Sequence, residues 1–124
     1  MINKQFVLVL HTKLILQFGG LDGIRDEALL ESALARPANL KAYVKGTTAF
    51  QSAADLAYGL IRNHPFIDGN KRIGMVMCEL MLLKSGYTIT ATEEEKYVLF
   101  TSVASGKITE KELALWLLSH SRRK

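Results

Sequence analysis

The sequence is poor in cysteine and proline, and no apolar run in it reaches membrane-spanning length. The single cysteine, Cys78, excludes an internal disulfide and indicates a reducing compartment. Because it lies in an apolar segment, we interpret it as a small buried side chain and not as a nucleophile. The apolar run Phe6–Leu10 is interrupted by His11 and Lys13 and is too short for a secretory or membrane segment. We therefore expect a cytoplasmic protein without a membrane partner.

Excess charge of one sign is also scarce. The net charge is +4, but Arg122, Arg123 and Lys124 at the C-terminal end supply three of those positive charges. The rest of the chain then holds 13 basic (16 − 3) and 12 acidic residues. A basic end of this kind is usually solvated, so the composition gives little reason to expect direct nucleic-acid binding.

Length and composition favour one helical domain. The chain has 124 residues, of which 48% are apolar and 23% charged, as in ordinary globular domains. Alanine, leucine, glutamate and lysine are frequent, and all four favour helix. Apolar spacing predicts helices near 3–18, 26–36, 48–62, 73–83, 92–105 and 109–117, although β-branched residues leave a strand possible at the start of the first. We predict an all-α fold, a compact bundle of about six helices around a buried central helix, in one domain of residues 1–124.

Local signals define the ends of these helices. Asp26 is placed to cap the second helix, and Pro37 is expected to follow its end. Thr92 and Thr109 each precede a glutamate by three residues, which is the spacing of a capping box. The segment 37–47, with an extended stretch at 42–44, is predicted to be irregular, and 87–90 is predicted to be an extended connector. Three alanines, at 53, 54 and 57, give the third helix a face that a neighbour can approach closely.

The most informative stretch is His64-Pro65-Phe66-Ile67-Asp68-Gly69-Asn70-Lys71-Arg72, which precedes the apolar segment 73–83. That segment is predicted to be a helix buried on most of its circumference, which would hold its N-terminus rigidly. The first N–H groups of a helix have no partner within the helix, and together with the helix dipole they form an anion site. Gly69 allows the backbone to approach a ligand closely. The sequence therefore predicts a phosphate-binding junction between loop and helix.

The side chains of this stretch suit transfer of a phosphorus-containing group. His64 precedes a proline, which keeps it in the loop, and an imidazole can deprotonate a hydroxyl near neutral pH. Asp68 is an oxygen ligand of the kind that Mg²⁺ takes. Charge on the phosphoryl group can be neutralised by backbone N–H groups from Gly69 onward and by the side chains of Asn70, Lys71 and Arg72. Phe66 is interpreted as a core anchor for the loop.

Each residue alone is more often structural, but the ordered set resembles the motif of the Fic family, His-Pro-Phe-x-Asp/Glu-Gly-Asn-Gly-Arg-x-x-Arg. The chain is most similar to the death-on-curing (Doc) branch, the toxin half of bacterial toxin–antitoxin pairs. The likeness also covers Phe18–Gly20, Gly23–Asp26, Leu30–Pro37 and Tyr58–Leu60. It implies that His64 is the base, that Asp68 is the magnesium ligand, and that residues 69–72 form the phosphate-binding turn.

Two departures from the Fic motif bear on the reaction. Lys71 stands where most Fic enzymes have glycine, and Met75 stands where they have a second arginine that helps to hold the distal phosphates of ATP. The Doc branch shares the lysine, and its members are understood to bind ATP in the reverse sense, with the γ-phosphate in the anion site. The resemblance thus implies a protein kinase that uses ATP and Mg²⁺. It also implies that the target is a threonine of elongation factor Tu and that its modification stops protein synthesis.

The resemblance also bears on regulation and leaves two other functions open. Self-restrained Fic proteins carry a Glu-Gly or Glu-Asn pair, which this chain lacks, so an inhibitor is expected from an antitoxin in trans. The segment 37–47 is interpreted as the flap that aligns a target peptide in larger Fic enzymes. One alternative function is transfer of AMP to a protein hydroxyl, which Lys71 and Met75 disfavour. The other is a catalytically idle module that binds its antitoxin.

Overall fold

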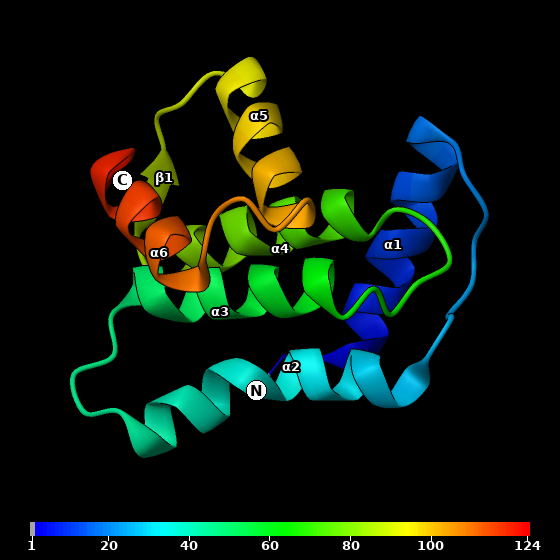
Figure 1. Cartoon of the computed structure of the whole chain (residues 1–124), viewed down its shortest axis with the longest axis horizontal. Helices are drawn as coiled ribbons and strands as arrows, with labels where there is room; N and C mark the ends of the chain where they lie inside the picture. The colour runs from blue at the N-terminus through cyan, green and yellow to red at the C-terminus, as the bar shows by residue number, and fades with distance from the viewer. Residues whose placement is uncertain (1) are drawn as a thin grey trace.

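The computed structural model describes residues 2–124, which form six helices and one small sheet (Figure 1). The helices are α1 (Lys4–Phe18), α2 (Glu27–Tyr43), α3 (Ala49–Arg62), α4 (Asn70–Lys84), α5 (Glu93–Ala104) and α6 (Glu110–Ser119). The strands are β1 (Tyr87–Ile89) and β2 (Ser121–Arg123). The predicted all-α class is confirmed. Within residues 2–124, no helix is both long enough and apolar enough to cross a membrane.

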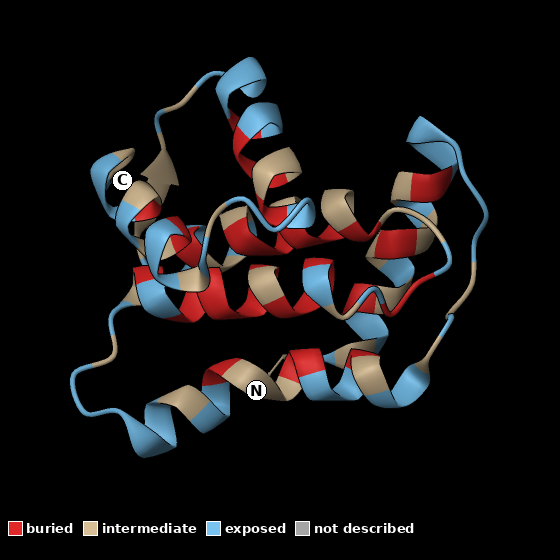
Figure 2. Cartoon of the chain, in the orientation of Figure 1, coloured by how far each residue is buried: buried red, intermediate tan, exposed pale blue. Residues whose placement is uncertain are grey.

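The centre of the bundle is α3, which lies between α2 on one side and α4 and α6 on the other (Figure 1). Ten of its 14 residues are buried, more than in any other helix described (Figure 2). The expectation that residues 73–83 would be buried on most of their circumference is wrong in part. Leu80 and Leu83 are 36% and 41% exposed, because α4 packs on α3 with one face and presents its outer face to solvent.

The contact between α3 and α4 depends on small residues, as predicted from the alanine face. Ala53, Ala54 and Ala57 are fully buried. On α4, a Cβ atom added to Gly74 would lie only 2.6 Å from Cγ1 of Ile61 and 3.3 Å from the carbonyl oxygen of Ala57. The two backbones therefore approach closely, which sets the position of the first turn of α4.

Most helix starts follow the local signals. Capping boxes are present at Thr92 and Thr109, as predicted, and a third at Thr48 with Gln51 was missed by the sequence reading. Asp26 caps α2 by accepting a hydrogen bond from the Leu29 N–H. Five of the six described helices thus begin with a side-chain cap; α4, which begins after Gly69, has none.

The second helix does not end at Pro37, and this prediction is wrong. α2 continues through Pro37 to Tyr43, so most of the segment 37–47 is helical. The proline is buried on the same stripe as Leu30, Ala33 and Leu34, at the spacing of one helical face. A proline inside a helix removes one backbone hydrogen bond, and here burial of its ring and the helix-favouring residues 38–42 offset that loss.

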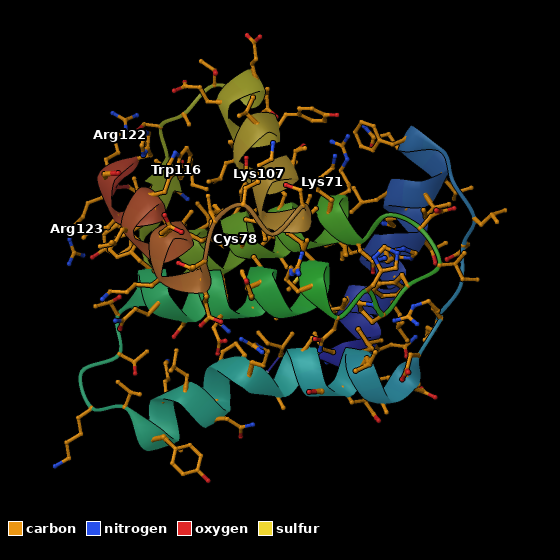
Figure 3. The ribbon with its side chains drawn as sticks, viewed as in Figure 1. Lys71, Cys78, Lys107, Trp116, Arg122 and Arg123 are labelled. Atoms are coloured by element: carbon orange, nitrogen blue, oxygen red, sulfur yellow. The ribbon has the colours of Figure 1, made fainter. Side chains whose placement is uncertain are left out.

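The basic C-terminal end is a strand and not a free tail. β2 pairs antiparallel with β1, with Arg122 opposite Thr88, and the Lys124 N–H donates to the Gly86 carbonyl at 2.8 Å. The predicted extended connector at 87–90 thus forms one half of a two-stranded sheet. The Arg122 and Arg123 side chains lie at that end of the molecule, away from Lys71 (Figure 3).

Candidate functional site

The motif loop connects α3 to α4, and the segment Gly23–Asp26, the bridging segment, binds it through the backbone. An isolated antiparallel bridge joins Ile24 to Phe66. The Ile67 N–H donates to the Gly23 carbonyl at 3.0 Å. The Pro65 carbonyl accepts from the N–H groups of both Arg25 and Asp26, at 2.7 and 3.0 Å. The loop is therefore anchored by residues about 40 positions earlier in the chain.

His64 has an exposed side chain on a constrained backbone. Its φ of 54° lies in the left-handed region, which residues other than glycine rarely adopt. The Arg25 guanidinium holds this turn by donating from Nε to the His64 carbonyl at 2.6 Å and from Nη2 to the Asn63 carbonyl at 2.9 Å. Among residues 2–124 the imidazole has no hydrogen-bond partner, so it is free to meet a substrate hydroxyl. The sequence reading assigned no role to Arg25, which the likeness to the Doc branch included only as part of a longer segment.

Asp68 is held at one carboxylate oxygen and free at the other. Its Oδ2 accepts from the Leu21 N–H at 2.8 Å, and no residue in the described part of the chain binds Oδ1. Residues 2–124 contain no cluster of three His, Cys, Asp or Glu side chains that could hold a metal by themselves. Mg²⁺, however, is usually held by one or two carboxylates together with substrate phosphates and water. The half-exposed Asp68 carboxylate fits a metal ion that arrives with a nucleotide.

The first turn of α4 leaves backbone N–H groups free where the sequence predicts an anion site. Gly69 has a φ of 80°, and the first N–H to bond back to it is that of Ile73, which reaches the Gly69 carbonyl at 2.9 Å. The N–H groups of residues 70–72 therefore have no partner within the helix, and no side chain caps them. A Cβ atom at position 69 would lie 3.2 Å from Cδ1 of Ile15 and 3.3 Å from Nε2 of His11. Both conformation and space restrict this position to glycine.

Asn70 has a different role from the one expected. Its Oδ1 accepts from the Phe66 N–H and its Nδ2 donates to the Phe66 carbonyl, both at 2.9 Å. The side chain is 4% exposed, so it closes the loop from within and does not face a phosphoryl group. The Phe66 side chain is 1% exposed, which confirms that it anchors the loop in the core.

The cationic side chains of Lys71 and Arg72 diverge from the start of α4. Lys71 reaches toward α5 (Figure 3), with Nζ 3.2 Å from Oγ1 of Thr101 and 4.4 Å from the centroid of the Tyr97 ring. The Arg72 guanidinium lies 3.9 Å from the Phe18 ring centroid, at the end of α1. Cations over aromatic faces are attracted by the ring quadrupole, so both side chains are partly held in place.

A pocket of about 290 Å³ opens beside these two cations. Its lining consists of Lys71, Arg72, Met75, Glu93, Glu94, Tyr97 and Phe100. Met75, at the position of the second motif arginine, therefore borders the pocket. The α5 residues were missed by the sequence reading, because nothing local connects them with a motif more than 20 positions earlier.

Cys78 lies outside this site. It is fully buried on α4, and burial raises the pKa of its thiol far above the ordinary value of 9.0. A thiol in that state is a poor nucleophile, which agrees with its interpretation as a core residue.

Comparisons with known proteins agree with the motif. The model of the Fic/DOC family matches residues 1–82, which include the bridging segment and the whole motif loop. Over 113 residues the chain is 28% identical to the protein kinase doc of Escherichia phage P1, covering 91% of this chain and 89% of that protein. Over 78 residues it is 38% identical to the toxin Doc of Mycolicibacterium smegmatis, covering 60% of this chain and 58% of that protein.

Proposed function

The chain belongs to the Fic/DOC family, within its Doc branch, and from that premise we propose that it is a toxin that phosphorylates a protein. The names of the two relatives, a protein kinase and a toxin, support both halves of this proposal. In it, the γ-phosphate of ATP is transferred to a hydroxyl of a translation factor. Following the resemblance of the motif, the target is a threonine of elongation factor Tu, in the cytoplasm.

The observation that carries the proposal is the uncapped N-terminus of α4, which follows a loop with an exposed imidazole and carries two cations in its first turn. Unpaired N–H groups at residues 70–72 can hold the oxygens of a phosphoryl group, and Lys71 and Arg72 can neutralise its charge. His64 accepts the proton of the attacking hydroxyl. A bond forms between that oxygen and the γ-phosphorus while the bond from the γ-phosphorus to the bridging oxygen breaks, so ADP leaves.

Asp68 would hold Mg²⁺ through its free oxygen, and the bound ion would neutralise charge on the phosphate oxygens. The bond from the Leu21 N–H to the other oxygen keeps the carboxylate in one orientation before the nucleotide arrives. No described side chain except Asp68 is proposed as a metal ligand.

AMP transfer is the second candidate function. It would place the α-phosphate at the start of α4 and the distal phosphates farther along the site. Met75 borders the pocket with an apolar side chain where Fic enzymes have an arginine, which argues against a clamp for distal phosphates there. An idle module is the third candidate. In each case restraint would come from an antitoxin in trans.

Labelled ATP distinguishes these functions. The purified chain is incubated with Mg²⁺, elongation factor Tu and ATP labelled on either the α- or the γ-phosphate, and in parallel with bacterial extract. Label transferred to protein only from the γ position supports the kinase, and label transferred only from the α position supports AMP transfer. Absence of both transfers supports the idle module.

His64→Ala is the matched variant for this experiment. We expect transfer to fall by about 10²–10⁴-fold, the usual contribution of a general base. Because the side chain is exposed, we expect the unfolding free energy to change by no more than about 0.5 kcal/mol in a urea titration. A folded variant that transfers phosphate at the wild-type rate would contradict the assignment of His64 as the base.

A further inference from the structure

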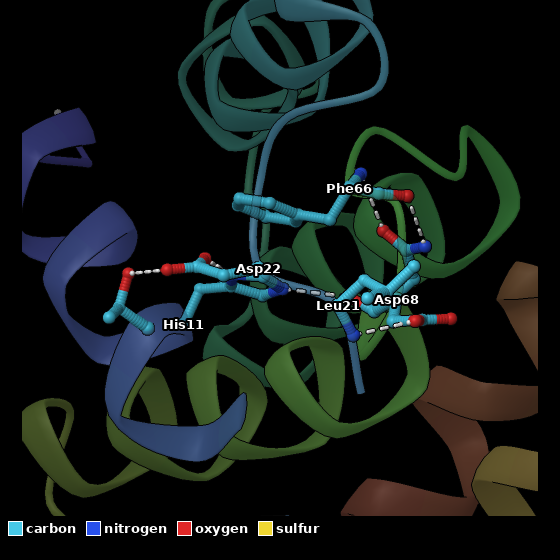
Figure 4. A network of polar contacts seen from close by, with 7 residues as sticks. His11, Leu21, Asp22, Phe66 and Asp68 are labelled. Atoms are coloured by element: carbon cyan, nitrogen blue, oxygen red, sulfur yellow. Dashed lines mark hydrogen bonds and ion pairs between the residues drawn. The ribbon is translucent and has the colours of Figure 1, made fainter. Parts of the chain in front are cut away.

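A buried histidine of α1, His11, lies against the back of the motif loop (Figure 4). It is 1% exposed, and its Nε2 is 2.7 Å from the carbonyl oxygen of Asp68. Its ring stacks on the Phe66 ring with 3.7 Å between centroids and 9° between planes. His11 thus contacts the backbone of the proposed metal ligand and the residue that anchors the loop, without facing the pocket itself.

The hydrogen bond from His11 fixes the direction of one peptide group. A carbonyl oxygen can only accept, so Nε2 carries the proton that it donates. The Asp68 carbonyl is therefore held toward α1. Because the peptide group between Asp68 and Gly69 is planar and trans, its N–H points to the opposite side. The Gly69 N–H is directed away from α1, at the turn where the proposed phosphoryl group binds.

The other edge of the imidazole faces a carboxylate. Nδ1 lies 3.4 Å from Oδ1 of Asp22, whose Oδ2 accepts from Oγ1 of Thr12 at 3.0 Å. The preceding residue, Leu21, donates its N–H to the Asp68 carboxylate. The segment after α1 therefore borders the histidine through Asp22 and holds the Asp68 carboxylate through Leu21, and Figure 4 shows these contacts on one side of the loop.

We propose that His11 is a positioning residue for the proposed phosphoryl transfer: through its bond to the Asp68 carbonyl it sets the peptide that joins the metal ligand to the anion site. This inference rests on the proposed function for its effect on turnover, but its structural part stands apart from any reaction. A ring at position 11 that only filled space would be replaceable by another apolar side chain. A ring that orients the peptide requires a donor at the position of Nε2.

Three substitutions of His11 distinguish a side chain that donates a hydrogen bond from one that only fills space. His11→Gln removes the ring but retains an amide N–H that can reach the Asp68 carbonyl. His11→Phe retains a ring that can stack on Phe66 but has no donor. His11→Leu is a smaller residue without a donor, and it replaces the phenylalanine variant if the larger ring prevents folding. Far-ultraviolet circular dichroism and thermal unfolding select the folded variants.

The first measurement is hydrogen exchange, in the free protein, of the loop amides of Phe66 and Ile67, which donate to Asn70 and to the Gly23 carbonyl. We expect the variants without a donor to exchange about 10-fold faster in this loop than wild type, while amides of α3 and α6 exchange at rates set by global stability. The glutamine variant should stay near wild type. Unchanged loop exchange in a folded variant without a donor would overturn the inference, whatever the protein catalyses.

The second measurement is γ-phosphate transfer at saturating ATP. The variants without a donor should lose about 10–100-fold in kcat, as supporting partners of metal ligands usually do, with KM for the protein substrate within about 2-fold of wild type. The glutamine variant should recover most of this loss. Equal impairment of all three variants would also overturn the inference. If wild type transfers no phosphate while loop exchange responds as expected, the proposed function fails and the positioning of the loop stands.

Discussion

Arg25 holds His64 in a backbone conformation that residues other than glycine rarely adopt. A left-handed backbone at a residue other than glycine costs about 1–3 kcal/mol and persists only where surrounding contacts impose it. The contacts here are the two bonds from the Arg25 guanidinium to the carbonyls of His64 and Asn63. Arg25 therefore determines where the proposed base stands, although it does not itself reach the pocket.

Replacing Arg25 tests this dependence. We expect Arg25→Met to lower phosphate transfer about 10–100-fold and the unfolding free energy by about 1–2 kcal/mol, because two charge-assisted hydrogen bonds are lost at a partly solvated position. Transfer assays and urea unfolding measure the two effects. Arg62→Met is the matched control, since Arg62 also donates to a carbonyl, that of Ala104 at 2.9 Å, but away from the motif loop. It should lose stability without loss of transfer, and an equal loss in both variants would contradict a specific role for Arg25.

At the scale of elements, the close pairing of α3 with α4 fixes the position of the proposed anion site. The position of the first turn of α4 depends on the packing of this helix against α3. That contact is made by the alanine face of α3 and by Gly74, which has no room for a side chain. A substitution that changed this packing would displace the N–H groups of residues 70–72 together, although every residue of the motif would be retained.

Gly74→Ala tests the packing. Alanine is favoured over glycine in a helix by about 1 kcal/mol, but overpacking a core usually costs about 1–3 kcal/mol. With a Cβ only 2.6 Å from Cγ1 of Ile61, we expect the packing cost to prevail and the unfolding free energy to fall. Chemical denaturation measures it. The double variant Gly74→Ala/Ile61→Ala should lose less unfolding free energy than the two single variants lose in sum, because the shorter side chain at position 61 makes room for the new Cβ. Losses that simply add would show that the two positions do not clash.

The features that sequence predicted well are those with local causes. Helix starts at Asp26, Thr92 and Thr109 depend on hydrogen bonds across three residues, which the sequence displays directly. Pro37 was misread because its local signal is a helix stop, and only the buried stripe of α2 outweighs it. β2 could not be predicted, because three residues form a strand there only by pairing with β1.

At the candidate site, too, features with local causes could be predicted and those that depend on tertiary packing could not. The motif itself indicated the anion turn, the base and the metal ligand, which remain proposals supported by the geometry. The direction of the Asn70 amide could not be predicted, because it depends on the fold of the loop around Phe66. The contacts of Lys71 with α5 and of Arg72 with Phe18 depend on how distant helices pack.

At the scale of the whole molecule, one polar network joins the consecutive helices α2 and α3 to the distant α6. Arg36 of α2 donates from Nε to Oδ1 of Asp55 on α3 at 2.8 Å, and its Nη2 contacts Oε1 of Glu110 on α6 at 2.5 Å. Asp55 is 5% exposed. Burial, together with the negative charge of Asp55, raises the pKa of Glu110, and the Arg36 guanidinium opposes that shift.

This shift predicts how stability changes with pH. Because the pKa of Glu110 is higher in the folded state than its ordinary value of 4.5, the folded state binds the proton more tightly than the unfolded state. The resulting stabilisation is complete below pH 4.5 and is lost as pH rises through the folded-state pKa. We therefore expect the unfolding free energy of wild type minus that of Glu110→Gln to fall across this window. Urea unfolding at a series of pH values measures the difference.

Glu94→Gln, at an exposed position on α5, is the control for this series. A fall with pH for Glu110→Gln that Glu94→Gln does not share would assign the dependence to the contacts of Glu110 with Arg36 and Asp55. A Glu110→Gln difference that rises with pH would instead mean that the pairing with Arg36 dominates and lowers the pKa of Glu110 in the folded protein.

Because backbone hydrogen bonds join residues 23–26 to the motif loop, the nine-residue motif alone would not keep its conformation in another protein. A graft of residues 63–72 onto another helical hairpin would carry the histidine, the aspartate and the glycine, yet it would leave the carbonyls of Asn63, His64 and Pro65 without the donors that shape the turn. Those donors lie about 40 residues earlier in the chain, so supplying them also means closing a loop of that length, at a cost in chain entropy. The geometry of the motif loop could therefore be transferred to another protein only together with the residues 23–26 that shape it.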